Sequence, residues 1–340
     1  MFRALLAATL LLAALPAGAR EKTDVVTLPN GDRLTGEIKG MSRGKLDFLT
    51  DDAGRLSIEW DKVQNVTSPH LYEAELTSGE RLYGTLSSPA DGVLAVGSPP
   101  MQEVVGITNV VQIVPMDEAF VNRVRAIFDL GFTLAKSNWA STLSTSGEFG
   151  YRAEDLGATL KFDGYFQDAE NIVAVSRWSA SLQGDWYFRN RWRALLGVQG
   201  ERNDELQLLL RTTVAAGVAH SVVRNGWTEL WLTGGLAGSW ESYLNTDPSY
   251  VLDALLVGSW DAFRYDTPKL DSNVSLALLP GLSDIGRLRG TLTVKVKYEI
   301  FKDFNVGVAF SDTFDTRPPD PDAPKNDFIT SLTVGWSYRR

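Results

Sequence analysis

"GTLTVKVKYEI", residues 290–300, alternates between polar and apolar side chains from its second residue to its last. Because successive side chains of a strand point to opposite faces, this pattern predicts a β-strand with one apolar and one polar face. In a soluble β-sandwich the apolar face would pack in a protein core. In a membrane β-barrel it would contact lipid, and the charged side chains would face a lumen. The rest of the chain has to distinguish these two environments.

The pattern recurs through the C-terminal part of the chain, in about twelve segments separated by turn residues. Most have roughly eleven residues, which suits a strand that crosses a bilayer better than the five or six residues of a typical globular strand. The segments are residues 126–136, 139–151, 156–166, 177–188, 191–202, 205–219, 227–239, 250–263, 269–279, 286–301, 304–314 and 327–338.

The connections between these segments alternate in length. Short links such as "RAED", "RN", "VRNG" and "KDFN" alternate with "QDAENIVAVS", "LNTDPS" and "TRPPDPDAPKN". Membrane barrels show this asymmetry, with short periplasmic turns and longer outer loops. The break at "YDTPKL" fits the alternation least well.

Aromatic residues gather at the segment ends, as in the two interfacial belts of a membrane protein. Beside the short links lie Trp186, Phe188, Trp192, Trp227, Tyr298 and Tyr338, and towards the opposite rim lie Trp139, Phe166, Trp178 and Trp240. We therefore predict an all-β protein: an antiparallel transmembrane β-barrel of about twelve strands over residues 126–340, preceded by a small periplasmic SH3-like β domain. A large soluble barrel is the alternative.

The N-terminus predicts export. Residues 1–19 combine Arg3, an apolar stretch from Ala4 to Leu15, and Ala17-Gly18-Ala19, which is typical of a signal-peptide cleavage site. An outer-membrane location with the N-terminal domain in the periplasm follows from this signal and from the alternating aromatic C-terminal segment. That segment predicts recognition by the barrel insertion machinery, although Arg339 and Arg340 follow its last aromatic residue.

Residues 20–116 contain a repeat. "TLPNGDRLTGEI" (27–38) returns as "ELTSGERLYGTL" (75–86), and each copy continues in short strand-like runs. Units of about fifty residues with five short strands predict two SH3-like or Sm-like barrels that could share a sheet. The shared G-[DE]-R-L-x-G pattern reads as a hairpin turn before a strand, with Arg33 and Arg81 as the alternative ligand contacts. Residues 117–125 are the predicted linker.

Composition excludes several classes of protein. The net charge of −9 argues against nucleic acid as a partner, and the absence of cysteine removes disulfides, thiolate metal sites and cysteine nucleophiles. A hydrophobic content of 44% is too low for several membrane-spanning helices. His70 and His220 are the only histidines, and Ser221 follows His220, so the two point to opposite faces of a strand. We therefore expect no enzyme, cofactor or metal site.

Five stretches resemble one known family. They are "NGDRLTGEI" (30–38), "GFTLAKSN" (131–138), "GVQGERNDELQLLLRTTVAAGVAHSVV" (197–223), "LTGGLAGSWESY" (232–243) and "NDFITSLTVGWSY" (326–338). The chain resembles the salt-induced outer membrane protein family, also called domain of unknown function 481, although Ser137 stands where that family has glycine. The resemblance implies an outer-membrane barrel, and it supplies neither an activity nor catalytic residues.

Two functions remain open. One is a narrow pore or stress-responsive envelope protein, whose candidate lumen-facing residues are Arg177, Asp185, Arg191, Arg193, Lys295, Lys297 and Glu299. These charges could instead pair and plug the barrel. The chain would then be a membrane-anchored protein that binds a periplasmic protein or the cell wall through residues 20–116, with outer-membrane lipid around its barrel.

Overall fold

The structure is a computed structural model that describes residues 21–98, 100–116, 123–135, 140–169, 172–188, 190–204, 208–244, 247–301, 304–317 and 325–336. The predicted signal peptide and most of the predicted linker lie outside these ranges. The described residues form two β-sheets and two short 3-10 turns. They contain no helix with the length and hydropathy that a membrane-spanning helix needs.

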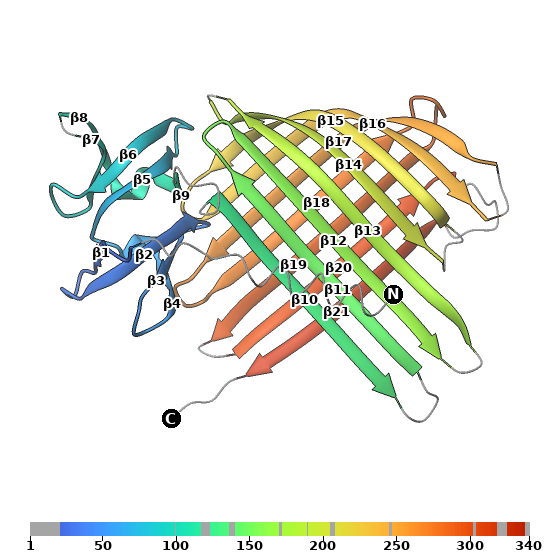
Figure 1. Cartoon of the computed structure of the whole chain (residues 1–340), viewed down its shortest axis with the longest axis horizontal. Coiled ribbons are helices and arrows are strands. Elements are labelled where there is room, and N and C mark those ends of the chain that lie inside the picture. The colour runs from blue at the N-terminus through green and yellow to red at the C-terminus, as the bar shows by residue number, and fades with distance from the viewer. Residues whose placement is uncertain are drawn as a thin grey trace.

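The first sheet, here called the module, has nine strands in the order β4-β3-β2-β1-β5-β6-β7-β8, with β9 paired to β2 and β5. It lies at one end of the molecule (Figure 1). Its strands are β1 (Asp24–Thr27), β2 (Arg33–Ser42), β3 (Lys45–Leu49), β4 (Arg55–Glu59), β5 (Asn65–Leu76), β6 (Arg81–Ser87), β7 (Val93–Ser98), β8 (Met101–Gly106) and β9 (Val110–Pro115).

The sequence repeat has a structural counterpart in the module. In the first unit, β1–β4 lead through the 3-10 turn η1 (Trp60–Lys62) into β5, and in the second, β5–β8 lead through η2 (Ile107–Asn109) into β9. The long strand β5 serves both units, because its first half pairs with β1 and its second half with β6 and β9. The two units therefore share one sheet, and their assignment to the SH3-like fold stays a prediction.

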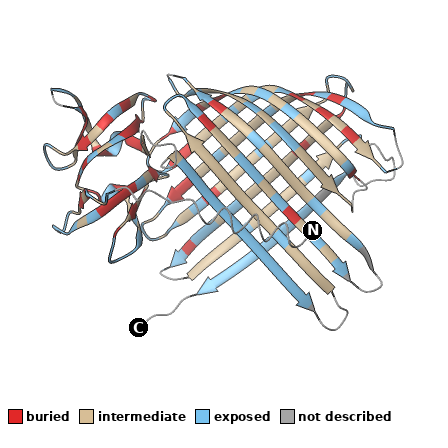
Figure 2. Ribbon diagram, viewed as in Figure 1, coloured by how far each residue is buried: buried red, intermediate tan, exposed pale blue. Residues whose placement is uncertain are grey.

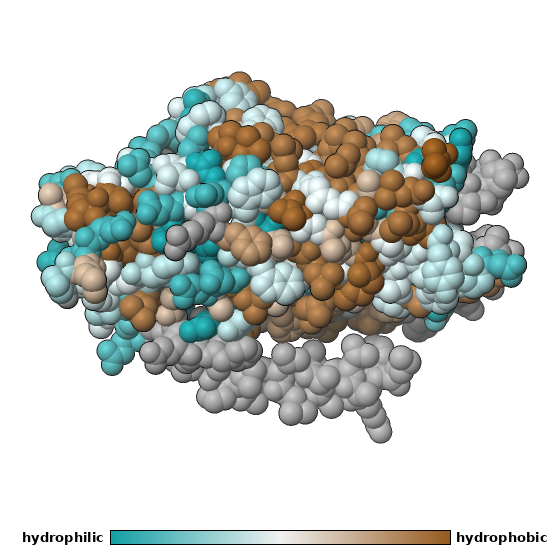
Figure 3. Space-filling view, turned by 90° about the horizontal axis from the view of Figure 1, so that it is seen from above, coloured by the Kyte–Doolittle hydropathy of each residue, from teal (hydrophilic) through white to brown (hydrophobic). Residues whose placement is uncertain are grey.

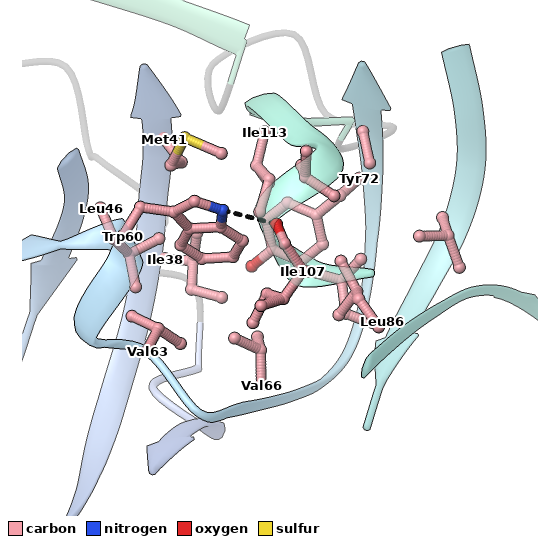
Figure 4. Packing of buried hydrophobic residues seen from close by; sticks show 14 of the residues in the cluster. Ile38, Met41, Leu46, Trp60, Val63, Val66, Tyr72, Leu86, Ile107 and Ile113 are labelled. Atoms are coloured by element: carbon pink, nitrogen blue, oxygen red, sulfur yellow. Dashed lines mark hydrogen bonds between the residues drawn. The ribbon is translucent and has the colours of Figure 1, made fainter. Parts of the chain in front are cut away.

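The core of the module joins the two units. The indole nitrogen of Trp60, in η1, donates a hydrogen bond of 2.9 Å to the carbonyl oxygen of Ile107, in η2 (Figure 4). At the junction, the buried Asp24 carboxylate accepts hydrogen bonds of 2.7 Å from the Ile38 amide and the Tyr72 hydroxyl. Fully buried polar groups are stable only with such partners, so these bonds fix the position of β1 between the units.

The second sheet has twelve antiparallel strands, each hydrogen-bonded to the next along the chain, which confirms the predicted all-β fold and its twelve-stranded sheet. The strands are β10 (Val124–Ala135), β11 (Ala140–Arg152), β12 (Leu156–Ala169), β13 (Ile172–Tyr187), β14 (Trp192–Asn203), β15 (Leu208–Arg224), β16 (Thr228–Tyr243), β17 (Ser249–Arg264), β18 (Leu270–Pro280), β19 (Leu288–Phe301), β20 (Phe304–Asp315) and β21 (Asn326–Trp336).

The large sheet is rolled, with β10–β13 in front and β17–β20 behind in Figure 1. Its concave face can be identified from Arg289 on β19, which contacts Glu241 on β16 across two intervening strands. In β19, Thr291, Thr293, Lys295, Lys297 and Glu299 share this face with Arg289, because they follow it at intervals of two. The apolar residues of the opening segment therefore lie on the convex face.

The convex face is a broad apolar surface. Seen from above, apolar side chains cover the middle of the large sheet, while hydrophilic residues dominate towards the module and at the opposite end (Figure 3). Exposed aromatic residues include Trp186, Phe188, Trp192, Trp227, Tyr298 and Phe166. Trp139 and Tyr338, which were also assigned to the two belts, lie outside the described residues.

The first and last strands of the rolled sheet are its two edges. Among the described residues, no pairing joins β10 to β21. Both strands are exposed along most of their length (Figure 2), and Phe132 and Leu332 expose 60% and 70% of their surface. In the part of the chain that the structure describes, the outer edges of β10 and β21 therefore have no strand partner, and a further strand can pair with such edges.

The irregular connection "YDTPKL" has a structural explanation. It joins β17 to β18 at the same end of the sheet as the module, and the Tyr265 hydroxyl donates to the carbonyl oxygen of Arg43 over 2.8 Å. Lys62 forms an ion pair of 3.2 Å with Asp266 in the same connection. The connection is longer than a tight turn because it docks against the module.

We expect Trp60→Phe to destabilise the module by about 0.5–1.5 kcal/mol, because the substitution removes the indole hydrogen bond to the Ile107 carbonyl, which then keeps only the Val110 amide as a donor. Far-UV circular dichroism during urea unfolding of residues 20–116 would measure the change. Met101→Ala is the matched control, since Met101 is 85% exposed. An unchanged midpoint for Trp60→Phe would mean that the contact between η1 and η2 does not hold the units together.

Candidate functional site at the mouth of the large sheet

The module lies against the turn end of the large sheet, here called the mouth. Two acidic side chains on β5, Glu73 and Glu75, lie on the same face of that strand and contact arginines of the mouth. Their partners Arg152 and Arg224 come from the mouth ends of β11 and β15, far away in sequence. The site therefore exists only when module and large sheet are docked.

Glu73 is fully buried in this contact. Its carboxylate accepts hydrogen bonds of 2.9 and 3.2 Å from Arg152, and Arg81 lies 3.8 Å away. Burial raises the pKa of the Glu73 carboxyl, even though both arginines favour its ionised form. The Arg152 guanidinium also stacks on the Tyr187 ring, 3.5 Å from its centroid, so its orientation is fixed from two sides.

The second acidic side chain makes an equivalent contact. Arg224 lies 2.7 Å from Glu75 of the module and 3.4 Å from Glu229 of β16. The guanidinium groups of Arg224 and Arg193 lie 5.8 and 4.6 Å from the ring centroid of Trp231. Aromatic rings of two strands, Tyr187 of β13 and Trp231 of β16, thus support arginines at the mouth.

The module also makes direct contacts with the backbone of the turns. Arg81 donates hydrogen bonds of 3.0 and 2.8 Å to the carbonyl oxygens of Glu154 and Phe188, in two neighbouring turns. A contact between side chains accompanies them, in which Arg43 donates a hydrogen bond of 2.8 Å to the Asp271 carboxylate. The last contact is more exposed and contributes less than the buried pairs.

Three of the candidate lumen residues lie near the mouth. Asp185 is buried, accepts hydrogen bonds of 3.1 Å from Gln183 and lies 3.7 Å from Arg193. Arg191 lies in the turn before β14 with a φ of 64°, packed against Gly79 of the module. The structure therefore brings Asp185, Arg191 and Arg193 together, with Arg191 outside the strand to which it was assigned.

The other four lie apart from this group, although the three on β19 are also towards the module end of the sheet. Arg177 is at the end of the sheet away from the module, with its guanidinium 4.9 Å from the Tyr165 ring. Lys295 and Lys297 are exposed on the concave face of β19 and line a cavity with Arg43. Glu299, 2% exposed, accepts a hydrogen bond of 3.2 Å from the Lys269 amide.

Charged residues also meet across the concave face at the far end. Arg211 bonds Glu201 over 2.5 Å and Glu241 over 3.0 Å, and Arg289 bonds Glu241 over 2.9 Å and contacts Asp253. Glu241 and Asp253 are fully buried. This series of pairs, here called the ladder, links four strands from β14 to β17 with β19.

Sequence reasoning did not identify Glu73, Glu75, Arg152 and Arg224 as site residues. The repeat held one usable signal, because Arg81 belongs to the shared G-[DE]-R-L-x-G pattern. In the structure this pattern forms a turn, and its arginine contacts the mouth. No cluster of three or more metal-ligating side chains occurs in the part of the chain that the structure describes.

Arg152→Gln should lower the free energy of unfolding more than Glu73→Gln does. Losing Arg152 leaves a buried carboxylate with Arg81 at 3.8 Å, and removing one partner of a buried pair costs about 3–5 kcal/mol. Glu73→Gln leaves a neutral amide and an arginine that still stacks on Tyr187. Urea unfolding of the full chain in detergent, followed by tryptophan fluorescence, would compare the two.

The same pair has a predictable pH dependence. A raised Glu73 pKa means that the docked state binds the proton more tightly than an unfolded chain does. Burial of the ionised Glu73 carboxylate therefore destabilises the docked state fully when the pH is above the docked-state pKa. This destabilisation disappears when the pH falls below the unfolded-state pKa. Arg152→Gln should lose less stability at acid pH than at neutral pH, and an equal loss at both would contradict this assignment.

A family model described as "Protein of unknown function, DUF481" matches residues 128–338, which span the large sheet. No curated protein and no solved structure matches the chain.

Proposed function

Because the chain belongs to the DUF481 family of proteins of unknown function, we propose from its geometry that it is an outer-membrane pore whose periplasmic mouth is closed by its own module. The observation that carries the proposal is the docking of the module onto the turn end of the rolled sheet through the buried residues Glu73 and Glu75. A lumen closed at one end in this way conducts only when the module moves.

The two faces of the large sheet support a membrane location. Leu232, Leu236 and Leu256 expose about half of their surface on the convex face, while the ladder residue Glu241 is buried on the concave face. Exposed apolar side chains over a continuous surface are unfavourable in water and favourable in lipid. Exposed tryptophans near the mouth, such as Trp192 and Trp227, suit the interfacial region.

Lipid would also close the sheet. An unpaired backbone group in hydrocarbon costs several kcal/mol, so spanning strands without partners do not persist there. The available edges of β10 and β21 would therefore pair with each other in the bilayer, completing a twelve-stranded barrel. Short turns at the mouth support a periplasmic position of the module, since membrane barrels carry their short turns on that side.

The ladder supports the second candidate, a membrane-anchored interaction protein with a plugged barrel. Arg211 and Arg289 each contact two carboxylates on the concave face, and such contacts could fill the lumen permanently. The module would then be the functional part, and its partner a periplasmic protein or the cell wall. Conductance without the module distinguishes the two candidates.

The opening segment provides a test of the membrane location. Val294→Arg places a cation on the lipid-facing surface, at a cost of about 2–4 kcal/mol near the midplane, so insertion and the heat-modifiable gel shift should decrease. Lys295→Glu changes the neighbouring residue on the concave face and should insert normally. Equal tolerance of both substitutions, or the absence of a heat-modifiable shift in the unaltered chain, would indicate a soluble sheet.

The closure by the module can be tested with a reversible cross-link, since the natural chain has no cysteine. Lys62→Cys and Asp266→Cys, joined by a cleavable bismaleimide, would tie the module to the mouth. In planar bilayers we expect openings in the unlinked protein, none in the linked protein, and recovery after cleavage. The single-cysteine variants are the controls.

Removing residues 20–116 should give a permanently conducting barrel if the module is the closing element. If the truncated protein inserts, shows the heat-modifiable shift and still does not conduct, the lumen itself is plugged. The second candidate function would then replace the first.

A further inference from the structure

A cavity of about 280 Å³ lies between the module and the mouth, and arginines dominate its lining. Five guanidinium groups and one carboxylate, that of Glu75, line it. The arginines come from both bodies: Arg81 from the module, and Arg152, Arg191, Arg193 and Arg224 from the mouth. Positive charge therefore exceeds negative charge along the cavity wall.

Two of the five arginines have their hydrogen bonds directed to the protein. Arg224 pairs with Glu75 and Glu229, and Arg81 donates to the two turn carbonyls. These contacts hold module and mouth together.

The other three arginines also contact acceptors of the protein, Arg152 at Glu73, Arg191 at the Val222 carbonyl oxygen and Arg193 at Asp185. Each of them nevertheless leaves one donor without an acceptor. Nη1 of Arg152, Nε of Arg191 and Nε of Arg193 are buried and have no hydrogen-bond acceptor among the described residues. Buried donors are nearly always paired in folded proteins, so three of them on arginines that line one cavity favour an anion bound there as their acceptor.

These donors are also held in fixed positions. Arg152 stacks on Tyr187 at 3.5 Å and Arg193 on Trp231 at 4.6 Å. Arg191 packs so closely on Gly79 that a Cβ at position 79 would overlap its Cγ. Fixed donors lose little conformational entropy on binding, which favours a ligand that needs several of them at once.

The geometry points to an anion-binding site in this cavity, with a phosphate group as its ligand. Planar guanidinium groups bind phosphate and carboxylate oxygens well, and a phosphate offers more acceptor oxygens than a carboxylate to donors on three separate residues. The volume exceeds that of a single phosphate ion, which leaves room for pyrophosphate or a phosphate ester. The site rests on the docked geometry alone and does not require the barrel to conduct.

Binding would stabilise the docked state. A ligand that contacts Arg81 together with Arg152, Arg191 or Arg193 binds only when module and mouth are together, so it shifts the equilibrium towards docking. If the proposed closure by the module holds, phosphate compounds would keep the pore shut.

Calorimetric titration of the folded full chain, in a detergent without phosphate, tests the site. Inorganic pyrophosphate and glycerol phosphate represent soluble ligands, and short-chain phosphatidic acid against phosphatidylcholine of equal chain length represents a lipid headgroup. We expect saturable binding of at least one phosphate compound, with acetate at least tenfold weaker. If the soluble phosphate compounds bind more tightly, the ligand is a soluble phosphate. If phosphatidic acid binds more tightly, the ligand is a lipid headgroup.

Arg191→Asn is the most informative variant, because asparagine tolerates the positive φ of 64° at this position. It should weaken binding at least tenfold, while Arg191→Lys, which keeps the charge, should lose less. Arg55→Gln is the matched control, since Arg55 pairs with Asp47 on the module surface away from the cavity. Each variant must show the same heat-modifiable shift and unfolding midpoint as the unaltered chain.

Two outcomes would overturn the assignment. One is the absence of saturable binding by any of these compounds to the folded chain. The other is equal affinity in Arg191→Asn and Arg55→Gln, which would mean that phosphate binds elsewhere. Neither outcome depends on conductance, so a non-conducting barrel with intact phosphate binding would count against the pore alone.

Discussion

The division of each long strand into an apolar and a polar face constrains the whole molecule. Since the convex face is apolar along the sheet, charged side chains of the strands collect on the concave face or at the strand ends. Charges confined to a narrow concave surface must pair there, as Arg211 and Arg289 do with Glu241. The same constraint concentrates arginines at the mouth, where the module provides part of the compensating charge through Glu73 and Glu75.

The extent to which sequence predicts this structure follows from the range of each interaction. Period-two alternation is local, so it located the twelve strands and the faces of β19. The pairing of Glu73 with Arg152 spans 79 positions and that of Glu75 with Arg224 spans 149, and no local pattern encodes either contact. Arg191 fitted the alternation of its strand, but a positive φ places it in the turn.

The connection "YDTPKL" shows the same limit. It departed from the alternation of short and long links because its length depends on the module, through Tyr265 and Asp266, rather than on the two strands that it joins. A connection whose length does not suit the two strands that it joins can therefore suit the interface between two sheets. The edges of β10 and β21 depend in a similar way on surroundings outside the chain, because water can satisfy their backbone groups and hydrocarbon cannot.

The two units of the module have diverged in how they meet the mouth. In the second unit, the turn of the repeated motif touches the large sheet, with Gly79 against Arg191 and Arg81 against two turn carbonyls. At the equivalent Gly31 of the first unit, an added Cβ would meet no atom within 4 Å. The first unit docks through a different turn, where Arg43 bonds Asp271 and a Cβ at Gly44 would lie 2.8 Å from the Gly226 carbonyl. A duplicated fold thus supplies two unlike contacts, and only the second brings glutamates and an arginine to the arginine-lined cavity.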